Sequence, residues 1–307
     1  MNAKSTIDRL AGIVMRANGA AATRDFYIKQ WGLTEVAQAN GAVYFRGTGP
    51  DYYIYGLRDD DVFGVDYVDF GVASRAGVDA LHGKLTALGV AVLGTPMPLA
   101  TPGGGYGFMA ADPDHRRLRF VTGVARHADT ADDPARPRRI THVVLNTPQM
   151  ETVQKFFEDA LGLQVSDRSG DQMVFMRVAS DHHAVALNAS AYPSVNHVAF
   201  EMPSIDAFMR GIGRMRTGGQ AVAWGPGRHG PGNNPFAYFV SPSGFVIEFT
   251  AEVQQIDEAT HEPQVWPRNV PEKMDVWMTA GPPTAAMRAV MQGRPDPGFP
   301  LVARASG

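Results

Sequence analysis

The sequence of 307 residues contains no cysteine. This absence excludes disulfides, thiolate catalysis and zinc–cysteine sites, so any metal must be held by His, Asp or Glu. Charge is sparse and nearly balanced, with 28 Lys and Arg against 31 Asp and Glu, and no basic cluster suits a nucleic-acid partner. No apolar run approaches the roughly 18 residues of a membrane span, and the first residues lack the apolar core of a signal peptide. We therefore expect a cytoplasmic protein without nucleic-acid or membrane partners.

The sequence does contain a diverged internal repeat. LAGIVMRANG, which begins at Leu10, aligns with ITHVVLNTPQ, which begins at Ile140. VDYVDF from Val65 aligns with VNHVAF from Val195 at the same offset of 130 residues (140 minus 10 and 195 minus 65). An offset of 129 residues (240 minus 111) aligns ADPDHRRLRF with VSPSGFVIEF. Three matches in one order predict two structurally similar halves.

Each half reads as a strand, a helix and then several strands, which predicts an α+β fold. A polar linker rich in proline and charge separates the halves. We expect an N-terminal non-catalytic domain at 1–127, the linker at 128–138, a C-terminal catalytic domain at 139–255 and a Pro-rich tail at 256–307.

The two halves differ at three positions where the second half has a possible metal ligand and the first half has none. The aligned pairs are His142 with Gly12, His197 with Tyr67, and Glu248 with Arg119. Side chains alternate between the faces of a strand, so Glu248 lies on the opposite face from Ile247 and Phe249. Two His and one carboxylate leave open positions on an octahedral ion, the facial arrangement of non-heme Fe(II) oxygenases, although zinc accepts the same ligands. We expect one metal site, in the second half.

At these residues the second half resembles the catalytic domain of a type I extradiol catechol dioxygenase of the vicinal oxygen chelate superfamily. The match covers about Ile140 to Val253. It rests on a His in the first strand, a His in the N-H-V-x-F context and a Glu after P-S-G, which are His142, His197 and Glu248 here. The resemblance implies two tandem vicinal-oxygen-chelate domains, each a pair of βαβββ modules. It also implies Fe(II) as cofactor.

A second set of polar residues carries the resemblance further. SDHHAVALNA is similar to the strand that holds the family's acid–base His, which implies this role for His183. GRHGPGNN and AYFVSPSG are similar to segments that place His229 and Tyr238 beside the substrate. His182 should face away from the site or buttress the loop, because neighbouring residues of a strand point to opposite faces. Phe175 is a candidate for packing on a substrate ring.

The resemblance implies that the enzyme opens a catechol with O2 next to the diol, as in the degradation of aromatic compounds, and that it assembles as a homo-oligomer. No charged residue is clearly placed to pair with a carboxylated ring, apart from Arg228, so we expect a neutral, alkyl- or aryl-substituted catechol, with a trihydroxylated ring as the open alternative. Two alternatives stay open. One is another metal-dependent isomerase or lyase of the same superfamily, and the other is a non-enzymatic resistance protein that sequesters a ligand.

Overall fold

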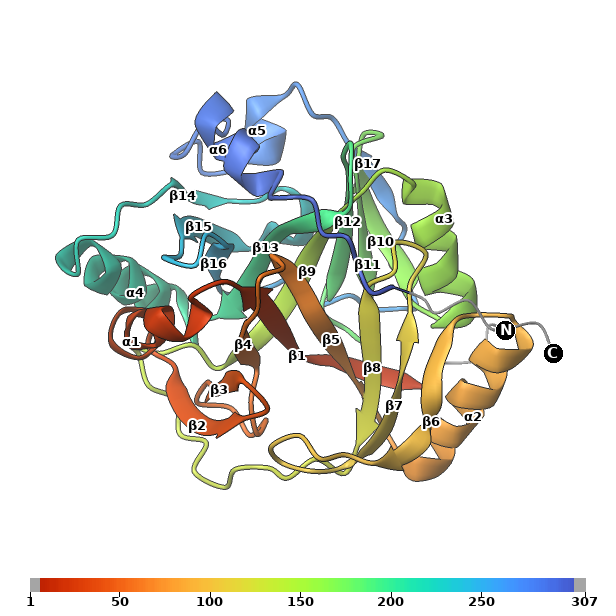
Figure 1. Ribbon diagram of the computed structural model, residues 1–307. Helices are drawn as coiled ribbons and strands as arrows, with labels where there is room; N and C mark the ends of the chain where they lie inside the picture. The colour runs from red at the N-terminus through yellow and green to blue at the C-terminus, as the bar shows by residue number, and fades with distance from the viewer. Residues whose placement is uncertain (1–5, 301–307) are drawn as a thin grey trace.

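The computed structural model describes residues 6–300 and contains two large sheets (Figure 1). In the first half, two βαβββ modules follow one another. The first comprises β1 (Ile7–Ala17), the turns η1 (Ala20–Thr23), α1 (Arg24–Phe26) and the π-helical η2 (Tyr27–Trp31), then β2 (Thr34–Ala39), β3 (Ala42–Arg46) and β4 (Tyr55–Asp59). The second comprises β5 (Gly64–Val72), α2 (Arg75–Ala87), β6 (Val92–Pro98), β7 (Tyr106–Ala111) and β8 (Arg117–Thr122).

The second half repeats this order. Its first module comprises β9 (Arg139–Thr147), α3 (Met150–Lys155), the π-helical η3 (Phe156–Ala160), β10 (Gln164–Ser169), β11 (Met173–Arg177) and β12 (Val185–Ala189). Its second comprises β13 (Ser194–Glu201), α4 (Ile205–Thr217), β14 (Trp224–Arg228), η4 (Pro231–Asn233), β15 (Pro235–Val240) and β16 (Val246–Thr250). The predicted fold class is confirmed, whereas the domain limits of 1–127 and 139–255 stay predictions.

Each sheet joins two modules through an antiparallel pair at its centre, β1 with β5 and β9 with β13. The strand orders are β2-β3-β4-β1-β5-β8-β7-β6 and β14-β15-β16-β13-β9-β12-β11-β10-β17. On either side of each centre the last strand of a module lies parallel to its first strand, as β16 does beside β13. The centre of each sheet is therefore where residues from different modules face one another.

The strand registers support the alignment of the two halves. In the second sheet His142 lies opposite Ala199, and Ala199 lies opposite Glu248. In the first sheet Gly12 lies opposite Asp69, and Asp69 lies opposite Arg119. The aligned pairs thus occupy equivalent places in the two sheets.

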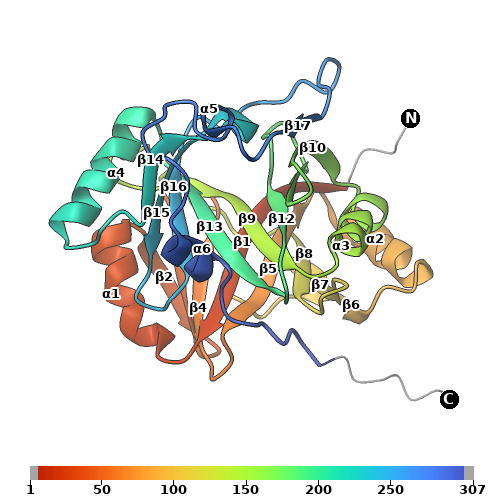
Figure 2. The same cartoon turned by 90° about the horizontal axis from the view of Figure 1, so that it is seen from above.

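One apolar core runs through both halves of the described chain. Figures 1 and 2 show α1 beside α4 at one side and α2 beside α3 at the other, with the sheets between them. Trp31, at the end of η2, is fully buried and stacks on Phe249 of β16. The first half thereby supports the strand that carries Glu248.

The C-terminal segment, residues 256–300, is built onto the second sheet. β17 (Gln264–Trp266) pairs in parallel with β10, and α5 (Pro271–Met274) and α6 (Ala285–Met291) follow. Figure 2 shows α6 in blue over β13. Among the described residues no helix is both long and apolar enough to cross a membrane.

Candidate functional site

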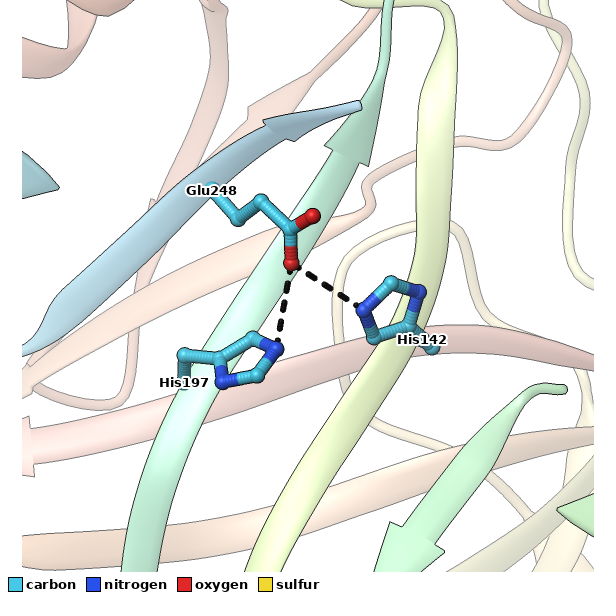
Figure 3. Close-up of side chains that lie close together, drawn as sticks. All are labelled: His142, His197 and Glu248. Atoms are coloured by element: carbon cyan, nitrogen blue, oxygen red, sulfur yellow. Dashed lines mark hydrogen bonds and ion pairs between the residues drawn. The ribbon is translucent and has the colours of Figure 1, made fainter. Parts of the chain in front are cut away.

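Three adjacent strands at the centre of the second sheet bring together His142, His197 and Glu248 (Figure 3). Oε2 of Glu248 lies 3.2 Å from Nε2 of His142 and 3.1 Å from Nε2 of His197. One possible ligand atom from each residue lies within 4.8 Å of the others. All three residues are buried, so the arrangement is a compact, preformed donor set.

The electrostatics of this donor set suit a cation. Burial alone would raise the pKa of Glu248, but His142 and His197 outweigh it and hold this pKa well below its usual range. Within the described residues, the buried Nε2 of His197 and Oε1 of Glu248 have no hydrogen-bond partner. Buried polar atoms without partners are costly, and a metal ion between them would satisfy both. The residues present therefore fit a divalent metal.

A network of amides orients the His197 ring. Its Nδ1 lies 2.8 Å from Oδ1 of Asn196, which leaves Nε2 free toward the other ligands. Asn196 lies at an irregularity in the pairing of β13 with β9, and its amide donates to Asn146. Asn146 in turn donates to Ser194 and to the backbone of α6 at Met291. Sequence reasoning missed this network, although the Asn directly before His197 was a visible signal.

A cavity of about 620 Å³ opens beside the donor set. His142 and His197 line it, and so do all four residues predicted for catalysis or substrate binding: His183, His229, Tyr238 and Phe175. The candidate metal ligands and the predicted catalytic and substrate-binding residues thus surround one cavity.

Tyr238 lies next to the candidate carboxylate ligand, Glu248. β15 pairs antiparallel with β16, and Tyr238 is directly opposite Glu248, so both side chains emerge on the same face. The Tyr238 hydroxyl lies 3.0 Å from Nε2 of His229. Burial and the charge of Glu248 raise the pKa of Tyr238 well above its usual value. Tyr238 is therefore a neutral hydroxyl that can donate a hydrogen bond into the cavity.

His229 directly follows β14 and packs flat on Phe236, with 4.0 Å between ring centroids. Burial lowers its pKa to about 4. The imidazole is therefore neutral at physiological pH, when one ring nitrogen donates and the other accepts. Together with Tyr238 it presents a neutral hydrogen-bonding pair to the cavity.

His182 and His183 lie in the loop before β12, which starts at Val185, and not in the strand itself. The alternation of a strand therefore does not govern their directions. Only His183 lines the cavity, where its ring lies 4.1 Å from that of His142 and edge-on to Phe175. His182 lies outside the cavity wall, but its Nδ1 is 3.0 Å from Nδ1 of His183. His182 thus lies outside the cavity and contacts the residue that lines it.

The C-terminal segment supplies much of the remaining cavity wall. Its contributions combine apolar residues with polar and charged ones: Pro271, Met274, Met278, Gly281, Pro282, Pro283 and Met291, together with Arg268, Asn269, Asp275, Arg288 and Gln292. Sequence reasoning set this segment aside because it lies outside the repeat. Its four methionines were the available signal, since methionine is adaptable and suits apolar binding surfaces.

The equivalent place in the first half holds an ion pair. Nε of Arg119 lies 2.6 Å from Oδ1 of Asp69, and the Tyr53 hydroxyl donates to Oδ2 of the same carboxylate at 2.6 Å. Burial would lower the pKa of Arg119, but Asp69 outweighs it and raises this pKa. Arginine cannot ligate a metal, and here it occupies the place that Glu248 takes in the second half.

Comparison with known proteins places this fold and site in a family. The model described as "Glyoxalase/Bleomycin resistance protein/Dioxygenase superfamily" matches residues 139–249. The solved structure of the Mn(II)-bound glyoxalase from Novosphingobium aromaticivorans is 37% identical in sequence, covers 92% of this chain and 94% of its own, and has a TM-score of 0.86. The chain belongs to this superfamily.

Relatives within the superfamily include ring-cleaving dioxygenases by name. Metapyrocatechase 2 from Cupriavidus necator is 37% identical over 155 residues, which are 49% of this chain and 47% of that protein, so the match spans about half the length of this relative. Biphenyl-2,3-diol 1,2-dioxygenase from Paraburkholderia xenovorans is 24% identical over 78% of this chain and 86% of its own. Homoprotocatechuate 2,3-dioxygenase from Arthrobacter globiformis, 22% identical with a TM-score of 0.80, covers 91% of this chain and 90% of its own and shares the fold.

Proposed function

We propose that the protein is a metal-dependent extradiol dioxygenase that opens a catechol-type ring with O2 next to the diol. The observation that carries the proposal is the convergence of His183, His229 and Tyr238 on the cavity beside the donor set. Relatives named metapyrocatechase and biphenyl-2,3-diol 1,2-dioxygenase support it. A binding protein that merely sequesters a ligand would need neither the donor set nor these three groups.

His142, His197 and Glu248 would hold the metal, which we propose is Fe(II). The ion, when bound, supplies Lewis-acid chemistry and a template that brings the diol and O2 together. The same donor set also suits Mn(II), and two relatives are named for manganese, the Mn(II)-bound glyoxalase and a manganese-dependent 2,3-dihydroxybiphenyl 1,2-dioxygenase from Geobacillus genomosp. 3. Metal analysis of anaerobically purified protein, followed by reloading with each ion, decides between them.

The remaining polar groups act on the substrate oxygens. His183 would accept a proton from a substrate hydroxyl and return it later, which suits an imidazole in a neutral state. Tyr238, held neutral by its raised pKa, would donate a hydrogen bond to a substrate oxygen. His229, hydrogen-bonded to Tyr238, would fix the direction of that hydroxyl. Phe175, edge-on to His183, would contact the face or edge of the ring.

The cavity favours a substrate with an apolar substituent. At about 620 Å³ it lies within the range of pockets that bind drug-sized ligands, so a single-ring diol would fill only part of it. Arg228 is committed elsewhere, because it pairs with Glu252 at 3.0 Å and does not line the cavity. We propose a neutral, alkyl- or aryl-substituted catechol, because proline and methionine side chains form much of the wall. Arg268 and Arg288 also line the cavity, so a carboxylated ring is the alternative that the substrate panel tests. Assembly as a homo-oligomer and a cytoplasmic location stay predictions.

The test uses protein loaded anaerobically with Fe(II) and a panel of catechols that carry no substituent, an alkyl chain, an aryl ring or a carboxylate. We expect equal consumption of O2 and diol, a yellow ring-opened product and the highest kcat/KM with an alkyl or aryl group. Hydroquinone is the control, because its hydroxyls are not adjacent and cannot chelate one ion. Met291→Trp should narrow the cavity and reduce kcat/KM for the aryl substrate more than for catechol. Iron-loaded protein that takes up no O2 with any diol would refute the proposal.

A second candidate is a metal-dependent isomerase, supported by the name glyoxalase of the relative that is 37% identical over most of both chains. Such an enzyme would use the same donor set without O2. The two candidates are separated by running the catechol panel and a hemithioacetal substrate on the same metal-loaded preparation. Turnover of the hemithioacetal with no oxygen uptake would favour the isomerase.

A further inference from the structure

A chain of hydrogen bonds leads from the cavity to the C-terminal segment. Nδ1 of His183 lies 3.0 Å from Nδ1 of His182, and Nε2 of His182 lies 3.0 Å from Oδ2 of Asp167 on β10. Asp167 also accepts from Nε1 of Trp266 at 2.7 Å and from the backbone N–H of Gln264 at 2.8 Å. His182, His183 and Asp167 are all buried. None of these contacts to Asp167 is required by the candidate metal site.

Asp167, at the end of this series of hydrogen bonds, determines which atom is the donor in each of them. Burial would raise the pKa of Asp167, but its hydrogen bonds outweigh this effect and lower the pKa. The ionised carboxylate can only accept, so Nε2 of His182 must carry a hydrogen. Burial also lowers the pKa of His182, more than Asp167 raises it, so the ring is neutral and its Nδ1 is an acceptor. Nδ1 of His183 must therefore be the donor in the contact between the rings.

We propose that Asp167 and His182 are positioning residues that hold His183 in the tautomer with Nδ1 protonated and Nε2 free. Among the described residues Nε2 of His183 has no hydrogen-bond partner, so its lone pair is available to a hydroxyl in the cavity. The logic is that of a carboxylate orienting a catalytic imidazole, with a second imidazole between them. The proposal rests on the proposed function only for the claim that this lone pair takes a substrate proton.

The loop that contains Gly232 packs against the two imidazole rings and holds them in place. Gly232 adopts φ +77°, and a Cβ at this position would lie 3.1 Å from Nδ1 of His182 and 3.2 Å from Cε1 of His183. The loop backbone thus covers the contact between the rings and excludes a larger side chain. From the other side, β17 delivers Gln264 and Trp266 to the carboxylate. The C-terminal segment therefore takes part in orienting His183 through Asp167.

The test reverses the direction of the hydrogen bonds from residue 167 to His183, and the side chain at residue 167 keeps its size. In Asp167→Asn/Trp266→Phe the amide oxygen can accept from Gln264 while its NH2 donates to Nε2 of His182, which forces hydrogen onto the opposite nitrogen of each ring. The reference is Trp266→Phe alone, which keeps the carboxylate. The tautomer of His183 is read by ¹H–¹⁵N NMR of ¹⁵N-histidine protein loaded with zinc, and the His183→Phe variant assigns the signals.

We expect Nδ1 of His183 to be protonated in the reference and unprotonated in the double variant. With Fe(II), oxygen uptake on catechol should fall about 100-fold relative to the reference, the low end of the loss of an acid–base group. Metal content and anaerobic catechol affinity should match the reference. An unchanged tautomer in the double variant would overturn the proposal, and so would an inverted tautomer with unchanged turnover. If no diol is oxidised by any variant, the NMR result still decides the orientation of His183 while the proposed function fails.

A second pair of variants keeps the proposal testable if the double variant does not fold. Glutamine can accept with its oxygen and donate with its NH2, so His182→Gln preserves the polarity of neutral His182. His182→Leu removes it. We expect turnover of His182→Gln to exceed that of His182→Leu by at least about 10-fold at equal metal content. Equal turnover of the two would show that His182 acts only by filling space.

Discussion

The indole of Trp31 stacks on the ring of Phe249, with 3.7 Å between centroids and 8° between planes. Phe249 follows Glu248 in β16, so the two side chains point to opposite faces of the strand. One face of this strand therefore carries the carboxylate of the candidate metal site, and the other is held by a residue from the first half. This contact gives the first half a structural role in placing Glu248.

Replacing Trp31 should destabilise the whole protein. Loss of a fully buried aromatic side chain typically costs about 3–5 kcal/mol, because the removed contacts leave a cavity beside Phe249. We expect Trp31→Ala to lower the free energy of unfolding by this amount in urea denaturation and to weaken metal binding. Trp277→Ala, at a partly exposed tryptophan, is the control and should cost much less. A loss for Trp31→Ala no greater than for the control would contradict the role assigned to the stack.

Metal binding should depend on three residues of the second half alone. We expect about one Fe(II) per chain in the parent, and His142→Ala, His197→Ala and Glu248→Ala should each lose it, because two ligands hold a labile ferrous ion poorly. His183→Phe should keep the metal, since His183 lies in the cavity wall outside the donor set. Elemental analysis after gel filtration measures the content, with His82→Ala as a distant histidine control. Two tightly bound ions per chain would refute the assignment.

The ion pair of the first half should matter for stability and not for metal content. Asp69→Asn leaves the buried guanidinium of Arg119 without its charged partner, which typically costs about 3–5 kcal/mol. Replacing both residues, as in Asp69→Leu/Arg119→Met, should recover much of this loss, because two charges no longer need to be buried. Chemical denaturation and metal analysis of both variants check this. If Asp69→Asn is as stable as the parent, the ion pair does not contribute to stability.

The free energy of unfolding should fall as the pH drops below the ordinary pKa of histidine, roughly 6.5. Burial lowers the pKa of His229 to about 4 in the folded state, against roughly 6.5 in the unfolded chain. Below pH 6.5 the unfolded state binds more protons, so the folded state loses stability progressively between pH 6.5 and about 4, whereas above pH 7 His229 contributes nothing. This difference in pKa corresponds to roughly 3 kcal/mol of unfolding free energy as an upper limit, and to less for a ring that faces a cavity.

This prediction is tested by measuring the free energy of unfolding of the metal-free protein at pH 7 and pH 5. The parent should lose more stability over this interval than His229→Gln, which has no titrating group at that position. The difference between the two proteins isolates the contribution of His229 from those of the other histidines. An identical loss in both would show that the pKa of His229 is ordinary.

The sequence alone was sufficient to predict the duplicated α+β fold and to bring His142, His197 and Glu248 into one hypothesis. The reason is local: each residue lies in a strand, the period of two sets its face, and the repeat shows which strands are equivalent. The strand assignment was wrong for His182 and His183, which lie in a loop before β12 where no such period applies. His183 nevertheless lines the cavity and His182 does not, as predicted.

Tertiary structure decided what no local pattern carries. The contact of Asp167 with His182 joins β10 to a loop. Trp266 reaches the same carboxylate from a position 99 residues further along the chain. The ion pair of Asp69 with Arg119 likewise depends on the parallel pairing of β5 with β8. A buried polar group takes whatever partner the packed chain brings within hydrogen-bond reach, and that partner is set by the fold as a whole rather than by its neighbours in sequence.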